Sequence, residues 1–289
     1  MVYYPKPNTY SLCLFKENMM KRIVAVNSNC YHGYSIEDAI EGIKEAGFHY
    51  VELTATKGWT EHVFPTQSFA YLCSVKDKLE RANIVPFAMS GHTNLMDRER
   101  IGDFIANMHL ANFFGCNYIV SSVGEAHLKD KAVASNEEVA GHIRDLVPYL
   151  EQYKLTLVIE NHGEHSTGAI VKSIVDLVDS ERVRVNYDTA NVIYFAGINP
   201  VEDLAACISS VGFLHIKDKI GGMKEWNFPA LGKGSVDFPR LLEMLNKANN
   251  NSPMSIEIEF TSAGSKNLAE VNQAVKDSYS YLKSLGLEI

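Results

Sequence analysis

The chain has 289 residues, of which 46% are apolar and 21% are charged, so it can bury a full core in one barrel or in two domains. Its net charge of −8 argues against nucleic acid as the main partner, because such affinity depends on lysines and arginines that neutralise phosphates. The five cysteines contain no CxxC pair, and no segment has the pattern of a transmembrane helix or a signal peptide. We therefore expect a cytoplasmic protein that binds a small molecule rather than nucleic acid or a membrane.

A repeated unit runs along the chain after a lead-in of residues 1–20. Each unit consists of a short apolar strand, a polar turn and an amphipathic helix. Eight strands are predicted, at Ile23–Asn27, Tyr50–Thr54, Val85–Ser90, Tyr118–Ser122, Leu155–Glu160, Val183–Asp188, Phe213–Lys217 and Met254–Glu259.

The segments between these strands carry signals for helix ends. Serine followed three residues later by an acidic residue is typical of a capping box, aspartate of a helix start, and glycine of a helix stop. Such signals occur at Ser35 with Asp38, Ser135 with Glu138, Asp237, Gly47 and Gly115. Strands that alternate with helices pair in parallel, and eight such units predict a closed α/β barrel, a (β/α)8 TIM barrel.

A doubly wound sheet is the structural alternative to the barrel. It is disfavoured because VNSNCYHGY, which follows the first strand, contains no glycine-rich phosphate-binding motif. No shift in composition and no linker rich in proline or serine marks a second domain. We therefore predict a single barrel domain over residues 21–289.

Four of the later strands carry a potential metal ligand at or near their ends. Because strand side chains alternate, Leu157 and Ile159 share one face of TLVIE while Glu160 lies on the other. The same alternation recurs on three further strands, at Asp188, His215 and Glu257. Three carboxylates and one imidazole suit Mn²⁺, Mg²⁺, Co²⁺ or Zn²⁺. Glu259 shares the face of Glu257, so the alternation alone leaves the choice between these two open.

Further polar residues lie at the predicted strand ends, where barrels of this kind build their active sites. A solvated or packed side chain is the alternative for each of them taken singly. The residues expected to bind substrate are Glu52, His92, Asn161, His162, Asn191, Lys217 and Lys219.

Five motifs, VIENHGE, NYDTAN, LHIKD, LGKGSVDF and SIEIEF, resemble the xylose-isomerase-like superfamily of barrels over Lys21 to Leu285. The similarity is to its sugar phosphate isomerase/epimerase group, which includes ketose 3-epimerases, hydroxypyruvate isomerase, inosose dehydratase and abasic-site endonucleases. This resemblance implies one divalent ion, with Mn²⁺ first in expectation, and it favours Glu257 over Glu259. The implied ligands are Glu160, Asp188, His215 and Glu257.

The same resemblance implies an isomerase or epimerase of a sugar, keto-sugar or related polyol. Glu160 and Glu257 are then the acid/base pair that moves a substrate proton through a metal-stabilised enediolate. Many 3-epimerases carry a histidine and an arginine where this chain has Asn191 and Gly221, so the substrate stays open.

Three alternatives to this function remain. An inosose-type dehydratase begins with the same proton abstraction, and a non-catalytic sugar-binding barrel is also possible. An abasic-site endonuclease is disfavoured by the acidic charge, by Asn191, and by the absence of its D-x-H motif at residues 226–228. Because the superfamily commonly forms dimers or tetramers, a homodimer or homotetramer is expected.

Overall fold

A closed barrel of eight parallel strands forms the centre of the computed structural model, which describes residues 22–124 and 133–289. The predicted lead-in, residues 1–20, lies outside the described residues. Strand β1 pairs with both β2 and β10, and this double pairing closes the sheet. In order around the barrel the strands are β1 (Val24–Asn27), β2 (Tyr50–Thr56), β4 (Val85–Ser90), β5 (Tyr118–Ser122), β6 (Thr156–Glu160), β7 (Val183–Asp188), β8 (Val211–Lys217) and β10 (Met254–Glu257).

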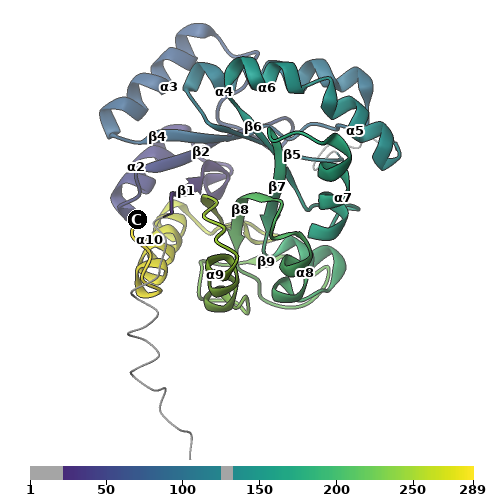
Figure 1. Ribbon diagram of the computed structural model, residues 1–289. Helices are drawn as coiled ribbons and strands as arrows, with labels where there is room; N and C mark the ends of the chain where they lie inside the picture. Colours follow the sequence, from purple (N-terminus) through teal and green to yellow (C-terminus); the bar gives the residue numbers. More distant parts are fainter. Residues whose placement is uncertain (1–21, 125–132) are drawn as a thin grey trace, which may run out of the picture.

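Helices surround these strands on the outside, as Figure 1 shows. Both predicted capping boxes form, at Ser35 and Ser135, and Asp237 caps its helix as predicted. Both predicted stop glycines are left-handed, with φ of 98° at Gly47 and 78° at Gly115. The helices are α2 (Ile36–Ala46), α3 (Phe69–Ala82), α4 (Ile101–Phe114), α5 (Asn136–Arg144), α6 (Val147–Tyr153), α7 (Gly168–Val178), α8 (Pro200–Cys207), α9 (Phe238–Lys247) and α10 (Leu268–Ser284). None of the described helices is long and apolar enough to cross a bilayer.

All eight predicted strands are present. Strands β4, β5 and β7 have the predicted bounds, and the other five differ by small shifts. Strand β10 ends at Glu257 rather than Glu259, because the chain then turns and Glu259 N donates to Phe228 O at 3.2 Å. Strand β8 begins earlier than predicted, at Val211. The prediction missed this start because Gly212 interrupts the apolar run of the sequence.

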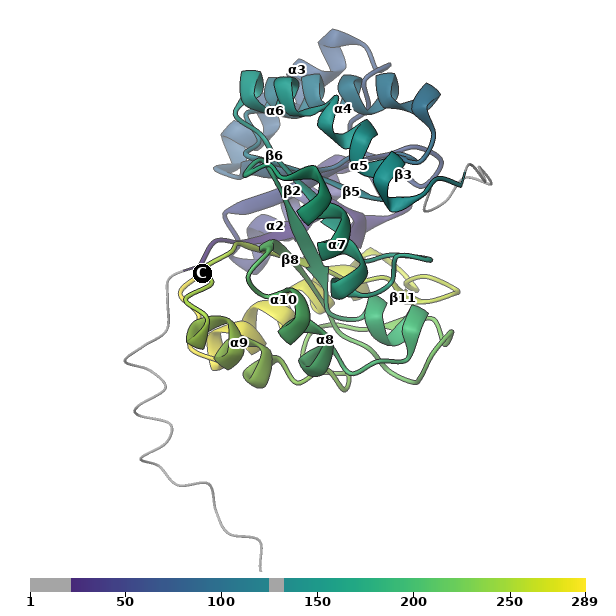
Figure 2. The same ribbon diagram turned by 45° about the vertical axis from the view of Figure 1, so that its right-hand side comes forward.

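Three strands of two residues each were not predicted: β3 (Thr60–Glu61), β9 (Asn227–Phe228) and β11 (Phe260–Thr261). Strand β3 folds back on β2, and β9 pairs with β11, both in the antiparallel sense. Figure 2 shows β3 and β11 on the same side of the barrel. Segments this short carry too few residues for an alternating pattern to be recognised in the sequence.

Two apolar clusters account for the core. The larger one fills the layer between sheet and helices and includes the outward residues of each strand. The smaller one lies inside the barrel and consists of Phe87, Ala88, Val120, Val158 and Phe213. Later inward positions of the same strands are polar, so the barrel interior changes from apolar to charged along its axis.

Candidate metal centre

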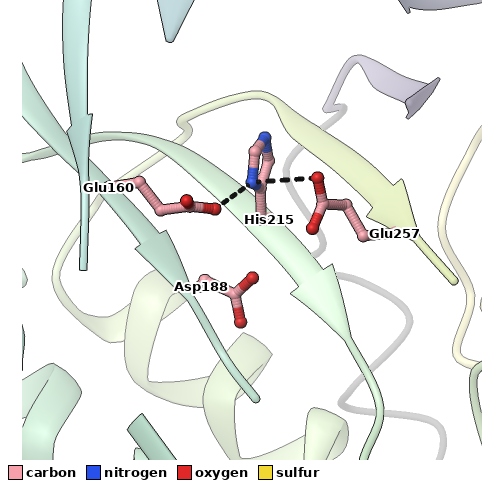
Figure 3. Close-up of side chains that lie close together, drawn as sticks. All are labelled: Glu160, Asp188, His215 and Glu257. Carbon is pink, nitrogen blue, oxygen red and sulfur yellow. Dashed lines mark hydrogen bonds and ion pairs between the residues drawn. The ribbon is translucent and has the colours of Figure 1, made fainter. Parts of the chain in front are cut away.

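The four predicted metal ligands come together at the C-terminal ends of β6, β7, β8 and β10, which are consecutive strands of the barrel. All four side chains are buried, and one ligand atom from each lies within 4.8 Å of the others. The register explains this convergence, since Asp188 on β7 pairs with His215 on β8. Figure 3 shows His215 between Glu160 and Glu257, with Asp188 below them.

Short polar contacts link these side chains to one another. His215 Nδ1 lies 2.6 Å from Glu160 Oε1 and 3.5 Å from Glu257 Oε1. Asp188 Oδ1 accepts hydrogen bonds from the backbone N–H groups of Ala190 and Asn191, at 2.7 and 2.8 Å. Its other oxygen, Oδ2, is buried and has no hydrogen-bond partner among the described residues. A buried carboxylate oxygen without a donor is an acceptor open to a cation.

The donor set fits a divalent ion. Carboxylate oxygens and an imidazole nitrogen bind such ions at about 2.0–2.6 Å, so ligands across one ion are about 4–5 Å apart. One ligand atom from each of the four side chains lies within 4.8 Å of the others, so all four can reach a single ion. Glu160, Asp188, His215 and Glu257 could therefore hold one ion, although the donor set does not select its identity.

Glu52 on β2 orients the imidazole of this cluster. His215 Nε2 lies 3.1 and 3.0 Å from the two carboxylate oxygens of Glu52, which is fully buried. The Nε2–H donates to this carboxylate, so Nδ1 points into the cluster. Metal-binding histidines commonly hold such a carboxylate behind them, which fixes the ring and raises its basicity.

The ionisable groups of the cluster have different pKa values. Burial raises the pKa of Asp188 to about 8, in spite of the Lys217 ammonium nearby, and burial likewise raises the pKa of Glu160. Burial also opposes the ionisation of Glu257, but the positive charges of His215 and Lys217 outweigh it and lower that pKa to about 2. Without an ion, negative charge is therefore concentrated on the Glu257 side.

Lys217 on β8 is a buried cation with two close carboxylate partners and a third, Asp188, whose Oδ2 lies 4.0 Å from its Nζ. Its Nζ lies 3.1 Å from Glu257 Oε2 and 2.9 Å from Glu259 Oε2. Burial disfavours its charge, but Glu259 and Glu257 raise its pKa well above the usual value. Glu259 also accepts a hydrogen bond from Asn29 Nδ2 at 3.2 Å. Glu259 is therefore engaged by Lys217 and Asn29, while Glu257 belongs to the cluster.

Three more of the predicted residues, His92, His162 and Asn191, line a small cavity above the cluster, together with Lys217. His92 Nδ1 accepts a hydrogen bond from Ser122 N at 3.0 Å, so a neutral His92 carries its proton on Nε2. That nitrogen is 3.9 Å from Glu160 Oε2. His92 therefore lies beside one of the two glutamates of the cluster.

Asn161 and Lys219, also predicted to bind substrate, are not among the described residues that line this cavity. Asn161 Oδ1 accepts from Asp188 N at 2.7 Å, and its Nδ2 donates to Asp188 O at 3.1 Å. Lys219 Nζ donates to the carbonyl of Ile220. In this structure Asn161 thus fixes the backbone of a cluster residue, and Lys219 ties down the loop after β8.

Asp218, next to Lys217, holds that loop in place. Its two carboxylate oxygens accept backbone hydrogen bonds from four residues at 2.8–3.1 Å. The donors are Lys219 at the start of the loop and, at its end, Gly232, Gly234 and Val236. A side chain on Gly234 would lie 2.3 Å from Asp218 Oδ1, so glycine is needed for this close approach.

Aromatic side chains form the rim of the site, and the sequence did not point to them. The inner cavity, of about 40 Å³, adjoins an outer cavity of about 730 Å³, with which it shares lining residues. The aromatic residues that line both are Trp59, Tyr194, Phe195 and Trp226. They lie in loops, in the π-helix Val192–Ala196 and beside the short strand β9, where no period relates an aromatic residue to a face.

Comparison with known families identifies one match. The sequence model described as "Xylose isomerase-like TIM barrel" matches residues 40–285, which is most of the chain. None of the curated proteins matches the sequence significantly.

Solved structures with the same fold cover nearly the whole chain. A xylose isomerase-like TIM barrel protein from Mycobacterium smegmatis, in complex with magnesium, is 14% identical over 91% of this chain and 97% of its own, with a TM-score of 0.70. D-allulose 3-epimerase from Methylomonas sp. is 17% identical over 92% of this chain and 99% of its own, with a TM-score of 0.69. 3-Keto-D-glucoside 4-epimerase from E. coli is 17% identical over 91% of this chain and 100% of its own, also with a TM-score of 0.69. At identities this low, the structural similarity establishes a shared fold and nothing more.

Proposed function

Since this chain belongs to the xylose isomerase-like TIM barrel family, we propose that it is a divalent-metal-dependent isomerase or epimerase of a sugar, keto-sugar or related polyol. The observation that carries the proposal is the buried cluster of three carboxylates and one imidazole at the C-terminal end of the barrel. The names of similar solved structures support it, because they include several sugar epimerases.

The ion is held by Glu160, Asp188, His215 and Glu257 in this proposal, with Mn²⁺ as the first candidate. Bound there, it supplies a Lewis acid that polarises the oxygen atoms of the substrate beside the reacting carbon. Asp188 serves only as a ligand, because its Oδ1 is already engaged by two backbone N–H groups.

Glu160 and Glu257 are the proposed acid/base pair. They reach the cluster from β6 and β10, on the two sides of His215, so a carbon held between them has a carboxylate on either face. A positioned carboxylate that takes or returns a proton accelerates such a reaction by about 10²–10⁴-fold. Glu257 is fixed for this role by Asn27 Nδ2 at 2.7 Å and by Lys217 Nζ at 3.1 Å.

The remaining polar groups of the inner cavity are proposed to bind substrate hydroxyls. The Nζ of Lys217 lies 4.6 Å from the centre of the Phe228 ring, and it can donate a hydrogen bond to a substrate oxygen in the inner cavity. His92, His162 and Asn191 line the same cavity and offer further donors and acceptors. Together they surround a polyhydroxylated ligand with hydrogen-bonding groups while the aromatic rim covers its apolar faces.

Proton exchange with solvent tests the proposal directly. The Mn²⁺-loaded protein is incubated in D₂O with a panel of ketoses, aldoses, inososes and disaccharides, and the products are identified by NMR. We expect deuterium on one carbon of at least one sugar, with formation of its epimer or isomer. A dehydrated product would assign the protein to the lyases instead. Absence of exchange with every member of the panel would overturn the proposal.

A metal-depleted sample is the control for this experiment. We expect chelation to abolish exchange and added Mn²⁺ to restore it, with about one ion bound per chain at full activity. Exchange that persists in the metal-depleted protein would contradict the proposed role of the ion.

A further inference from the structure

The two adjoining cavities differ greatly in size. The inner cavity has a volume of about 40 Å³ and the outer one about 730 Å³. The inner volume accommodates only a few water molecules, at about 10–15 Å³ each. The outer volume falls within the range of about 300–1,000 Å³ that is typical of ligand pockets. A sugar whose reacting carbon lies at the cluster must therefore extend into the outer cavity.

Aromatic rings in fixed positions form one wall of the outer cavity. The indole of Trp226 meets Tyr194 edge-on, with ring centres 5.6 Å apart and an interplanar angle of 85°. It meets Phe228 in the same way, at 5.1 Å and 86°. Because two neighbouring rings pack against it at nearly right angles, the indole of Trp226 is held in a fixed orientation in the cavity wall.

A second aromatic surface comes from the loop after β2. The rings of Trp59 and His32 are stacked, with centres 4.1 Å apart and an interplanar angle of 11°. Trp59 Nε1 donates to Asn29 Oδ1 at 2.8 Å, which fixes the indole. Strands β2 and β8, which lead to the two indoles, are separated in the barrel by β1 and β10. The outer cavity therefore has aromatic surfaces on loops from different parts of its rim.

The polar groups of the outer cavity are mostly uncharged. They include Asn29, Thr261, Ser262 and Ser265, the histidines His32 and His162, and Glu259 as the carboxylate. None of the described residues that line it is a lysine or an arginine. A phosphate group is normally bound by such cations, whereas a sugar ring presents apolar C–H faces and neutral hydroxyls. The lining therefore suits a neutral sugar ring and disfavours a phosphate.

From these observations we propose that the outer cavity binds a second sugar ring, so that the substrate is a glycoside or disaccharide rather than a free monosaccharide or a sugar phosphate. The inference rests on the proposed function in one respect, namely that the reacting sugar occupies the inner cavity. It adds a binding subsite in which the indoles of Trp59 and Trp226 contact the ring that does not react.

Tryptophan fluorescence provides a direct test, because the chain has only two tryptophans and both line the outer cavity. The full-length protein, loaded with diamagnetic Mg²⁺, is titrated with glucose, glucose 6-phosphate, maltose, cellobiose and trehalose. We expect at least one disaccharide to shift the emission and to bind at least tenfold more tightly than glucose, while glucose 6-phosphate gains nothing over glucose. A disaccharide advantage below tenfold for all three, or tightest binding of glucose 6-phosphate, would overturn the proposal.

Two variants change the outer cavity in opposite ways. Trp226→Ala removes a wall, and Ser262→Phe fills space on an exposed turn, so the second variant remains informative if the first fails to fold. In both we expect the affinity ratio of disaccharide to glucose to fall below threefold. Phe69→Ala is the matched control, because Phe69 is 70% exposed on α3 and lines neither cavity. A tenfold ratio that survives in every folded variant would refute the subsite.

Failure of this inference can be distinguished from failure of the proposed function. Tight disaccharide binding without any deuterium exchange would refute the isomerase or epimerase and leave the subsite intact. Deuterium exchange into free monosaccharides, without a disaccharide advantage in binding, would refute the subsite alone.

Discussion

The two ends of the barrel interior differ in chemistry although the same strands build both. On β6 the inward residues are Val158 at the apolar end and Glu160 at the charged end, only two positions apart. On β8 they are Phe213 and His215. Burial of apolar side chains at one end stabilises the folded state. At the charged end, burial disfavours the ionised carboxylates and raises the pKa of Asp188 and Glu160. One end of the interior therefore stabilises the fold, and the other is kept for binding and chemistry.

The largest expected effect concerns the glutamates of the charged end. Glu160→Gln and Glu257→Gln should each lower the rate of substrate hydrogen exchange by about 10²–10⁴-fold, because an amide cannot accept the proton. Glu259→Gln is the matched control and should lose less than tenfold, since Glu259 pairs with Lys217 outside the metal cluster. An inactive Glu259→Gln variant combined with normal exchange by Glu257→Gln would reverse the assignment.

The next effect belongs to the apolar end. Phe213→Ala should lower the free energy of unfolding by about 3–5 kcal/mol, as large-to-small changes of buried aromatic residues do, while the folded fraction still binds metal. Asp188→Asn is the counterpart at the charged end. It should lose the metal but change the stability of the metal-free protein by less than about 1 kcal/mol, because its side-chain oxygen can still accept from Ala190 and Asn191.

Urea denaturation and metal analysis of both variants measure this contrast. Comparable losses of stability in the two metal-free variants would mean that the two ends do not divide stability and binding between them.

A smaller effect is expected behind the metal cluster. Glu52→Gln should weaken metal affinity by about 10–100-fold, because it removes the negative charge that makes the His215 imidazole a stronger ligand. Competition with a chromogenic chelator measures the affinity. An unchanged affinity would show that Glu52 is dispensable for the orientation and basicity of His215.

The last expected effect is the pH dependence of metal binding. Burial raises the pKa of Asp188 to about 8, so below that pH its carboxyl holds a proton that must leave before it can bind an ion. Burial disfavours the charge of His215, but Glu52, Glu257 and Glu160 raise its pKa well above the usual value, so its imidazolium must also lose a proton to bind an ion. Apparent affinity should therefore rise by at least about tenfold per pH unit up to about pH 8 and continue to rise above it. Titration calorimetry in two buffers of different ionisation enthalpy would detect the released proton. An affinity independent of pH between 6 and 8 would contradict the expectation.

Much of this contrast can be predicted from the sequence, because it follows from period-two alternation. TLVIE predicts both the strand β6 and the inward direction of Glu160, and the same reasoning applies to Asp188 and His215. Alternation does not report which side chains are close across the barrel. Glu52 was expected among the strand-end residues that bind substrate. It is instead the third residue of β2, and its carboxylate contacts His215 Nε2 rather than lining the inner cavity.

The choice between Glu257 and Glu259 shows a second limit of the alternation. Both lie on the same face of the predicted strand, but the observed strand ends at Glu257 and Glu259 turns toward Lys217. The aromatic rim was not predicted either, because Trp59 and Trp226 lie in loops whose positions depend on tertiary contacts. Sequence periodicity therefore predicts the direction of side chains on regular strands but not the positions of side chains in loops.

Asp218 allows the sequence of the loop after β8 to vary without moving the strand before it. Its carboxylate fastens the loop at its start, through Lys219, and at its end, through Gly232 and two later residues. The intervening residues, Trp226 among them, can therefore be replaced without displacing the strand that carries His215. Substitutions in this loop can thus change the rim of the site while the metal-binding residues on the strands stay in place.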